Sequence, residues 1–177
     1  MTRFLRVSPR ALAAILLIAG SAVPVGSRAQ VGENNVSLKV GTQAPAVTIE
    51  DLQGKPVALN ELIKGKPAVI EFWATWCEQC AALQPEIDRI TQRFGDRVQV
   101  VAVAVGVAQT VRRVQQHVTE HKIPYPVLWD GRGAAVRAYN AATTAIVVIV
   151  DAQGKVIYNG VGPSQKLIAE VERALQY

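Results

Sequence analysis

The stretch IEFWATWCEQCAAL, residues 70–83, contains both cysteines of the 177-residue chain, Cys77 and Cys80. The apolar run Ala68–Trp73 precedes them, and its unbroken hydrophobicity is typical of a strand buried on both faces in a parallel or mixed sheet. After Cys77, apolar residues recur at helical spacing as far as Phe94. The stretch therefore predicts a strand, a turn and a long helix that begins at the first cysteine.

The remaining sequence predicts neighbours for this strand and helix within one domain, because 177 residues, half of them hydrophobic, suffice for one sizeable core. The expected elements are a hairpin around Gly54, a helical turn over 60–64, a strand over 98–105, a helix over 110–121, a return segment over 122–130, a short helix over 134–139, a hairpin around 151–154 and a closing helix from Ser164. This order predicts an α/β sandwich with a central mixed β-sheet flanked by helices.

Residues 1–29 are typical of a signal peptide. A basic start with three arginines precedes the apolar run 11–25, and Ser27 and Ala29 supply the small residues of a cleavage site. The run is shorter than the roughly 20 residues that span a bilayer, so cleavage is favoured, and an uncleaved membrane anchor through residues 11–25 is the alternative. An exported chain works in the periplasm or another extracytoplasmic compartment, where disulfides persist.

The mature chain is expected to begin with a flexible linker, residues 30–39, followed by the domain over 40–177. Without the leader, 15 basic residues face 14 acidic ones, so the formal charge of +5 belongs largely to the leader. The mature part also has no basic run interleaved with aromatic residues. The sequence therefore indicates no nucleic-acid partner.

The spacing of the two cysteines favours redox chemistry. Residues three apart share a helix face, so the sulfurs of Cys77 and Cys80 can meet. Free amides and the dipole at a helix start stabilise a thiolate, so we expect a lowered pKa at Cys77, which makes it the attacking sulfur. Cys80, one turn inside the helix, is expected to stay protonated until it resolves the mixed disulfide. Glu78 adds negative charge beside Cys77, which disfavours the thiolate and favours a reductant over an oxidant.

Glu71 is the candidate acid-base residue. It lies on the strand that leads to the cysteines, among apolar neighbours, where desolvation is expected to raise its pKa into the range useful for moving the proton of Cys80. The alternative is a structural carboxylate at a sheet edge or paired with a lysine.

The quoted residues resemble a known family. FWATWCEQC after a buried strand resembles the active-site stretch of thioredoxin-like proteins, and the leader together with APAVTIEDLQGKPVALNEL, YPVLWD and VDAQGKVIY resembles the exported TlpA/ResA/CcmG group of thiol-disulfide oxidoreductases. The resemblance spans residues 40–175. It implies a thioredoxin-like fold, Cys77 as nucleophile with an exposed sulfur, Cys80 as resolving thiol, Trp76 on the surface around that sulfur, and Glu71 at the position of the buried acid.

The same resemblance implies partners. We expect disulfide-containing protein substrates, among which the cysteines of apocytochrome c are compatible with the sequence, an upstream membrane thiol reductant, and no bound organic cofactor or metal.

Ala145 departs from the family pattern, which has a cis-proline at this point in a loop that presents backbone to the substrate. A cis bond before a non-proline residue costs about 3 to 4 kcal/mol. The Thr144–Ala145 peptide is therefore expected to be trans, or the loop over 140–145 to be reshaped. Thr144 and Ala145 remain candidate substrate-binding residues.

Several alternatives compete with this interpretation. The cysteines could bind copper or an iron–sulfur cluster, or join His117 and His121 in a metal site. A thioredoxin-like fold is expected to place these histidines on the surface, away from the cysteines. Ala145 also leaves open a non-catalytic binding module.

Two further alternatives are weaker. A peroxiredoxin-type peroxidase would carry threonine where this chain has Ala74. A purely structural disulfide would close so short a loop that it would remove little chain entropy. We therefore predict an exported thiol-disulfide oxidoreductase that reduces its protein partners.

Overall fold

The computed structural model describes residues 36–177. The predicted leader, its alternative role as an anchor and most of the predicted linker lie outside these residues. From Ser37 the chain is packed: the Ser37 hydroxyl donates to the Tyr139 carbonyl at 2.6 Å, and the Asn159 side chain donates to the Leu38 carbonyl at 2.9 Å. Within residues 36–177, no helix has the length and apolar character needed to cross a membrane.

A seven-stranded mixed sheet forms the centre of the domain, in the order β2-β1-β5-β4-β3-β6-β7. β3 and β5 both pair with β4 in parallel, whereas the other pairs are antiparallel. The predicted mixed sheet is thus confirmed. The strands are β1 (Thr48–Asp51), β2 (Pro56–Ala58), β3 (Ala68–Trp73), β4 (Gln99–Val105), β5 (Val127–Asp130), β6 (Ile146–Val150) and β7 (Val156–Val161).

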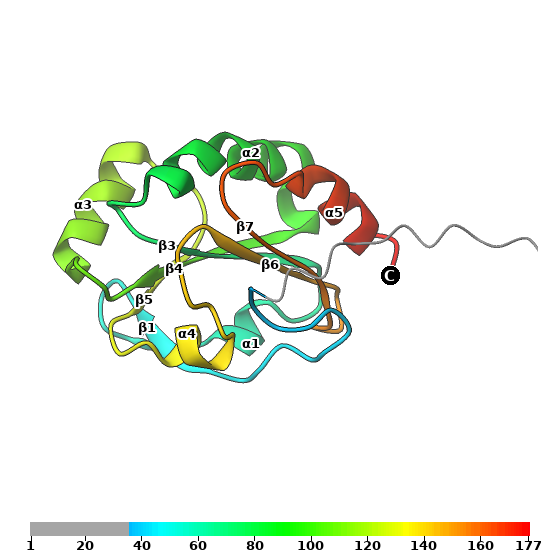
Figure 1. The fold of residues 1–177 in the computed structure, drawn as a ribbon, viewed down its shortest axis with the longest axis horizontal. Coiled ribbons are helices and arrows are strands. Elements are labelled where there is room, and N and C mark those ends of the chain that lie inside the picture. The colour runs from blue at the N-terminus through cyan, green and yellow to red at the C-terminus, as the bar shows by residue number, and fades with distance from the viewer. Residues whose placement is uncertain (1–35) are drawn as a thin grey trace, which may run out of the picture. The chain divides into compact units, whose positions relative to one another are not determined.

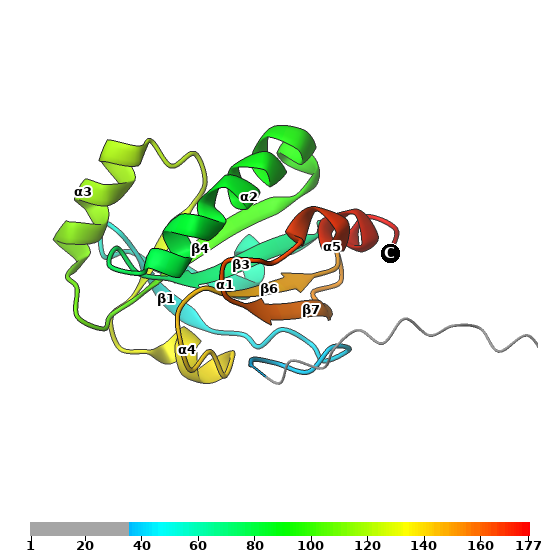
Figure 2. The same ribbon diagram turned by 45° about the horizontal axis from the view of Figure 1, so that its top comes forward.

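Helices cover both faces of this sheet, giving three layers. Figure 1 shows α2, α3 and α5 on one face and α1 and α4 on the other. Figure 2 shows α5 beside α2 on their common face. The helices are α1 (Leu59–Leu62), α2 (Glu78–Phe94), α3 (Val111–His121), α4 (Ala134–Ala138) and α5 (Leu167–Ala174), and a 3-10 turn, Gly95–Arg97, follows α2.

The decisive strand and helix are those that the sequence predicts. β3 spans Ala68–Trp73 and all six of its residues are buried, as expected for a strand with neighbours on both sides. Cys77 is the N-cap of α2, and Gly95, with a φ of +50°, ends it. Alternation along β3 directs Phe72 toward the face of α4, where its ring packs 5.5 Å from that of Tyr139. Glu71 therefore projects to the opposite face, beneath α2.

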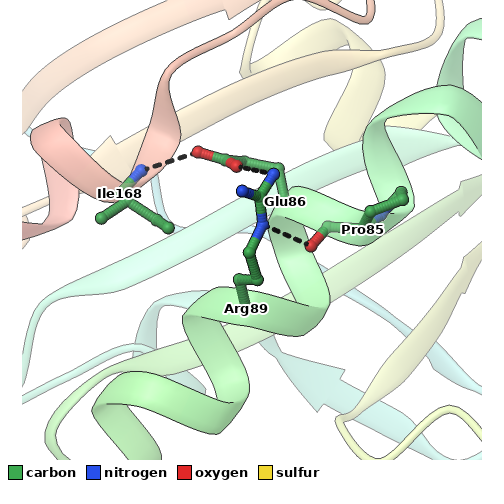
Figure 3. A network of polar contacts seen from close by, with 4 residues as sticks. All are labelled: Pro85, Glu86, Arg89 and Ile168. Atoms are coloured by element: carbon green, nitrogen blue, oxygen red, sulfur yellow. Dashed lines mark hydrogen bonds and ion pairs between the residues drawn. The ribbon is translucent and has the colours of Figure 1, made fainter.

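The closing helix differs from the prediction, because α5 begins at Leu167 and not at Ser164. Its N-cap, Lys166, makes no capping hydrogen bond through its side chain. The cap is instead supplied by α2: Glu86 accepts a hydrogen bond from the Ile168 amide at 3.2 Å and pairs with Arg89 at 2.6 Å (Figure 3). Because the capping carboxylate comes from another helix, local sequence does not reveal where α5 begins.

Candidate active site

Cys77 and Cys80 form a disulfide where α2 begins, with their Cα atoms 5.3 Å apart. Cys77 has extended backbone, and its Sγ accepts a hydrogen bond from the Cys80 amide at 3.1 Å. The first amides of a helix have no partner within the helix, so this amide is free to stabilise a thiolate on Cys77. The predicted meeting of the two sulfurs is therefore present in the structure.

The expectation of an exposed sulfur at Cys77 is wrong for the disulfide form, in which both cysteines are buried. Cys77 is 7% exposed and Cys80 is 5% exposed in this disulfide form. The assignment of Cys77 as the attacking sulfur consequently depends on its position at the helix start. It stays a prediction.

Hydrogen bonds from the β4–α3 connection hold the turn that carries Cys77. The Thr75 amide donates to Gln109 Oε1 at 2.9 Å, and the Trp76 indole donates to the Val107 carbonyl at 2.8 Å. Gln109 is itself held, because its Nε2 donates to the Val105 carbonyl at 2.6 Å. Gln109 and Val107 are not among the predicted site residues, because nothing in their own segment indicates that they contact residues more than thirty positions earlier.

Glu71 is a buried carboxyl group without a partner. It is 3% exposed, and its Oε1 has no hydrogen-bond partner among the described residues. β3 lies between β4 and β6, where Glu71 is level with Ala102 and Val147, so a sheet-edge position is excluded. Burial raises the pKa of Glu71 to about 8. The predicted desolvation is found, and the group is mostly protonated at pH 7.

A cavity of about 550 Å³ connects this carboxyl group to the disulfide. Glu71 and both cysteines line it, and so do two further buried groups without hydrogen-bond partners, Trp73 Nε1 and Thr75 Oγ1. Water molecules fit in such a volume and find polar partners there. The cavity thus offers room for water between Glu71 and Cys80, and the catalytic role of Glu71 stays a prediction.

The prediction for the two histidines is confirmed only in part: His121 is exposed and His117 is half-buried, but the two do not lie away from the cysteines. His117 and His121 line the same cavity as Cys77 and Cys80. The His117 ring is 5.2 Å from the Trp73 ring and stacks 4.0 Å from the His121 ring. The predicted separation from the cysteines is wrong because α3 begins soon after β4 and its last two turns border the space beside α2.

Burial and the neighbouring His121 lower the pKa of His117. Within residues 36–177, no three side chains of the His, Cys, Asp or Glu type are grouped so that they could hold a metal ion.

The loop at the cis-proline position lies at the same end of the sheet as the disulfide. Ile146, the first residue of β6, is level with Phe72 near the end of β3. Ala145 is fully buried with a φ of +56°, and Asn140, at the start of the loop, has a φ of +51°. No peptide bond among residues 36–177 is cis, so the Thr144–Ala145 bond is trans.

Exposed apolar side chains lie at the same end of the sheet as the disulfide. Trp76 and Val107, joined by the indole hydrogen bond, are 43% and 64% exposed. Val161, at the end of β7, is 38% exposed and pairs with Ile146. We call Trp76, Val107 and Val161 the apolar rim. Only Trp76 was expected from the sequence.

Comparisons with known proteins agree with this geometry. Residues 39–175 match the Redoxin family. The chain is 27% identical to thiol-disulfide oxidoreductase ResA of Bacillus cereus, across 86% of this chain and 87% of ResA. It is 28% identical to thioredoxin-like protein YneN of Bacillus subtilis, across 81% and 82% of the two chains.

A solved structure from Chlorobium tepidum, which bears the name thiol:disulfide interchange protein DsbE, superposes with a TM-score of 0.69 at 25% identity. It covers 78% of this chain and 99% of its own. The fold is thioredoxin-like, and the matched residues 39–175 include every strand and helix described above.

Proposed function

The chain belongs to the Redoxin family and to the TlpA/ResA/CcmG group of thiol-disulfide oxidoreductases, and from this membership we propose that Cys77 and Cys80 reduce disulfides of extracytoplasmic proteins. The observation that carries the proposal is the disulfide at the start of α2 beside the apolar rim. Clustered exposed apolar side chains, such as the contacting Trp76 and Val107, are typical of surfaces that dock other proteins. A protein substrate fits this surface better than a small thiol does.

The proposed reaction has two exchange steps. In the reduced protein, the Cys77 thiolate attacks one sulfur of the substrate disulfide, which forms a mixed disulfide and releases the other substrate sulfur as a thiolate. Cys80 then loses its proton and attacks Cys77 Sγ, which releases the second substrate sulfur and forms the Cys77–Cys80 disulfide. Two electrons pass to the substrate, and the two substrate thiolates take up protons.

Glu71 is proposed to handle the proton of Cys80 in the second step. A carboxyl group with a pKa of about 8 is a stronger base than an ordinary carboxylate. It shares the cavity with Cys80, so in its ionised form it can take the thiol proton as Cys80 attacks, and in its protonated form it can return a proton when the disulfide is reduced again.

The proposed extracytoplasmic location, and with it the membrane electron donor, depends on export by the predicted leader, residues 1–29. A chain exported by residues 1–29 would meet its substrates outside the cytoplasm, and a membrane thiol carrier would return two electrons and two protons to the oxidised pair. The cysteines of apocytochrome c are one substrate class that this placement allows.

The test uses the Cys80→Ser variant, which lacks the resolving thiol. Mixed with a protein that contains a disulfide, the variant is expected to accumulate a covalent complex through Cys77, detected on a non-reducing gel and released by dithiothreitol. Cys77→Ser is the matched control and is expected to form no such complex.

A redox titration of the wild-type protein should also show one reversible two-electron couple. A cysteine pair that stays oxidised, or a Cys80→Ser protein that captures no disulfide-containing protein, would contradict the proposal. Stoichiometric copper or iron in the purified protein would favour the metal-binding alternative.

A further inference from the structure

Ala145 has a backbone conformation that an alanine rarely adopts without support. Its φ of +56° lies in the left-handed region, which costs free energy for a residue with a Cβ atom. Two donors hold its carbonyl oxygen: the Gly162 amide at 3.0 Å and Gln165 Nε2 at 3.0 Å. The second donor is a side chain from the turn between β7 and α5.

Gln165 is itself anchored at both ends of its amide group. Its Nε2 also donates to the Gly162 carbonyl at 2.8 Å, and its Oε1 accepts a hydrogen bond from the Tyr158 hydroxyl at 3.1 Å. Gly160 leaves room for this arrangement, because a Cβ atom there would lie 2.7 Å from Gln165 Oε1 and 2.1 Å from the Tyr158 hydroxyl oxygen. The side chain therefore has a defined position between the turn and Ala145.

The tethered segment lies beside the cysteine pair. A Cβ atom on Gly162 would be 3.7 Å from the side-chain oxygen of Gln79, which stands between the two cysteines in sequence. Next to Ala145, Thr144 is half-buried and Thr143 is exposed. Within residues 36–177, no hydrogen bond involves the backbone groups of these two threonines. Their amides and carbonyls thus have no hydrogen-bond partner among the described residues, and these groups could pair with another chain.

We propose that Gln165 is a positioning residue that holds Ala145 in its left-handed conformation and so presents the free backbone of Thr143 and Thr144 to an extended segment of the protein substrate. The inference rests on the proposed function and assigns a positioning role to the turn between β7 and α5. Main-chain hydrogen bonds to an extended peptide are a general way for a sheet-bordering segment to bind a partner. In this chain a side-chain amide from outside the loop sets the loop geometry.

The test compares Gln165→Met, which keeps the side-chain length but removes the amide, with Gln53→Met, an exposed glutamine whose side chain has no hydrogen bond among the described residues. We expect Gln165→Met to lower kcat/KM for reduction of a peptide disulfide about tenfold, mainly through KM. Exchange with dithiothreitol, which needs no docked chain, should change less than twofold. Gln53→Met should match the wild type in both assays.

A double-variant experiment separates positioning from general damage. Proline at position 145 has a φ near −65° and cannot adopt +56°, so in an Ala145→Pro background the amide has no left-handed residue to hold. The effect of Gln165→Met should then fall below about twofold. Tyr158→Phe removes only the hydroxyl that anchors Gln165 and should lower kcat/KM for the peptide disulfide about two- to threefold. This variant tests the same positioning role if the proline variant does not fold, and an unchanged kcat/KM would contradict it.

The outcomes distinguish the two proposals. An equal loss toward dithiothreitol and the peptide, or a tenfold effect that persists beside Ala145→Pro, would overturn the positioning role while leaving the oxidoreductase intact. A wild-type protein that exchanges with dithiothreitol but with no protein or peptide disulfide would overturn the proposed function and the docking role together.

Discussion

Glu71 combines two properties that are rarely found together, deep burial and no partner. Its neighbours in β4 and β6 supply no charge, and the neutral form avoids the cost of a buried carboxylate. The cavity beside it leads to the disulfide. A group with these properties destabilises the fold when it ionises and is suited to exchanging protons near neutral pH.

Burial of Glu71 should make stability depend on pH. The pKa is about 8 in the folded protein and 4.5 as the reference value, so between these values the folded state binds more protons than the unfolded state. The contribution of Glu71 to the free energy of unfolding should therefore be most favourable below pH 4.5 and decrease as pH rises through 8, by up to about 4 kcal/mol. Urea titrations of oxidised wild type and Glu71→Gln at pH 5 and 8 measure it. Equal pH dependence in both proteins would refute the assignment.

The same substitution tests the proton transfer. Glu71→Gln should slow Cys80-dependent resolution of a mixed disulfide about tenfold, because the amide cannot accept the thiol proton. Rapid-quench kinetics with a preformed mixed disulfide on Cys77 measure this step. Unchanged resolution in a folded variant would remove Glu71 from the mechanism.

At the scale of elements, α2 and the turn before it are positioned by residues from elsewhere in the chain. The long run of apolar residues at helical spacing specifies α2. Gln109, however, holds the turn that places Cys77 at the N-terminus of α2. Gln109 bridges the Thr75 amide and the Val105 carbonyl, and thereby joins the end of β4 to the active-site turn.

Loss of the Gln109 bridge should loosen the turn. Gln109→Leu would leave the Thr75 amide and the Val105 carbonyl without their partner, which should lower the free energy of unfolding by about 1 to 3 kcal/mol. Urea unfolding measures this effect. Gln116→Leu, an exposed glutamine on α3, serves as the comparison, and equal stabilities of the two variants would contradict the structural role of the bridge.

At the scale of the whole molecule, the fold places two different surfaces beside the disulfide, the apolar rim and the polar cavity. The three residues of the apolar rim come from three separate segments: the β3–α2 turn, the β4–α3 connection and the end of β7. The polar cavity lies between α2 and α3, with the end of β3 as its floor. Protein docking and proton exchange can therefore be altered independently.

Charging the apolar rim should impair only reactions with proteins. Val107→Lys and Val161→Lys are each expected to reduce kcat/KM for a protein disulfide about three- to tenfold, because a lysine would have to be desolvated on docking. Exchange with dithiothreitol should be unaffected. Val40→Lys places the same change at an exposed valine outside the rim and should leave both rates unaltered. Parallel insulin-reduction and dithiothreitol assays make the comparison, and an intact protein rate in both rim variants would argue against docking there.

The sequence by itself determined the strand Ala68–Trp73, the helix that follows it, the meeting of Cys77 with Cys80 and the burial of Glu71. Each of these features depends on local periodicity or on spacing within one helical turn. Tertiary structure alone decided that His117 and His121 line the cavity, that Gln109 and Gln165 hold the two loops beside the disulfide, and that α5 begins where Glu86 caps it. These contacts join segments distant in sequence, and their geometry follows from how the helices pack on the sheet, which no local pattern encodes.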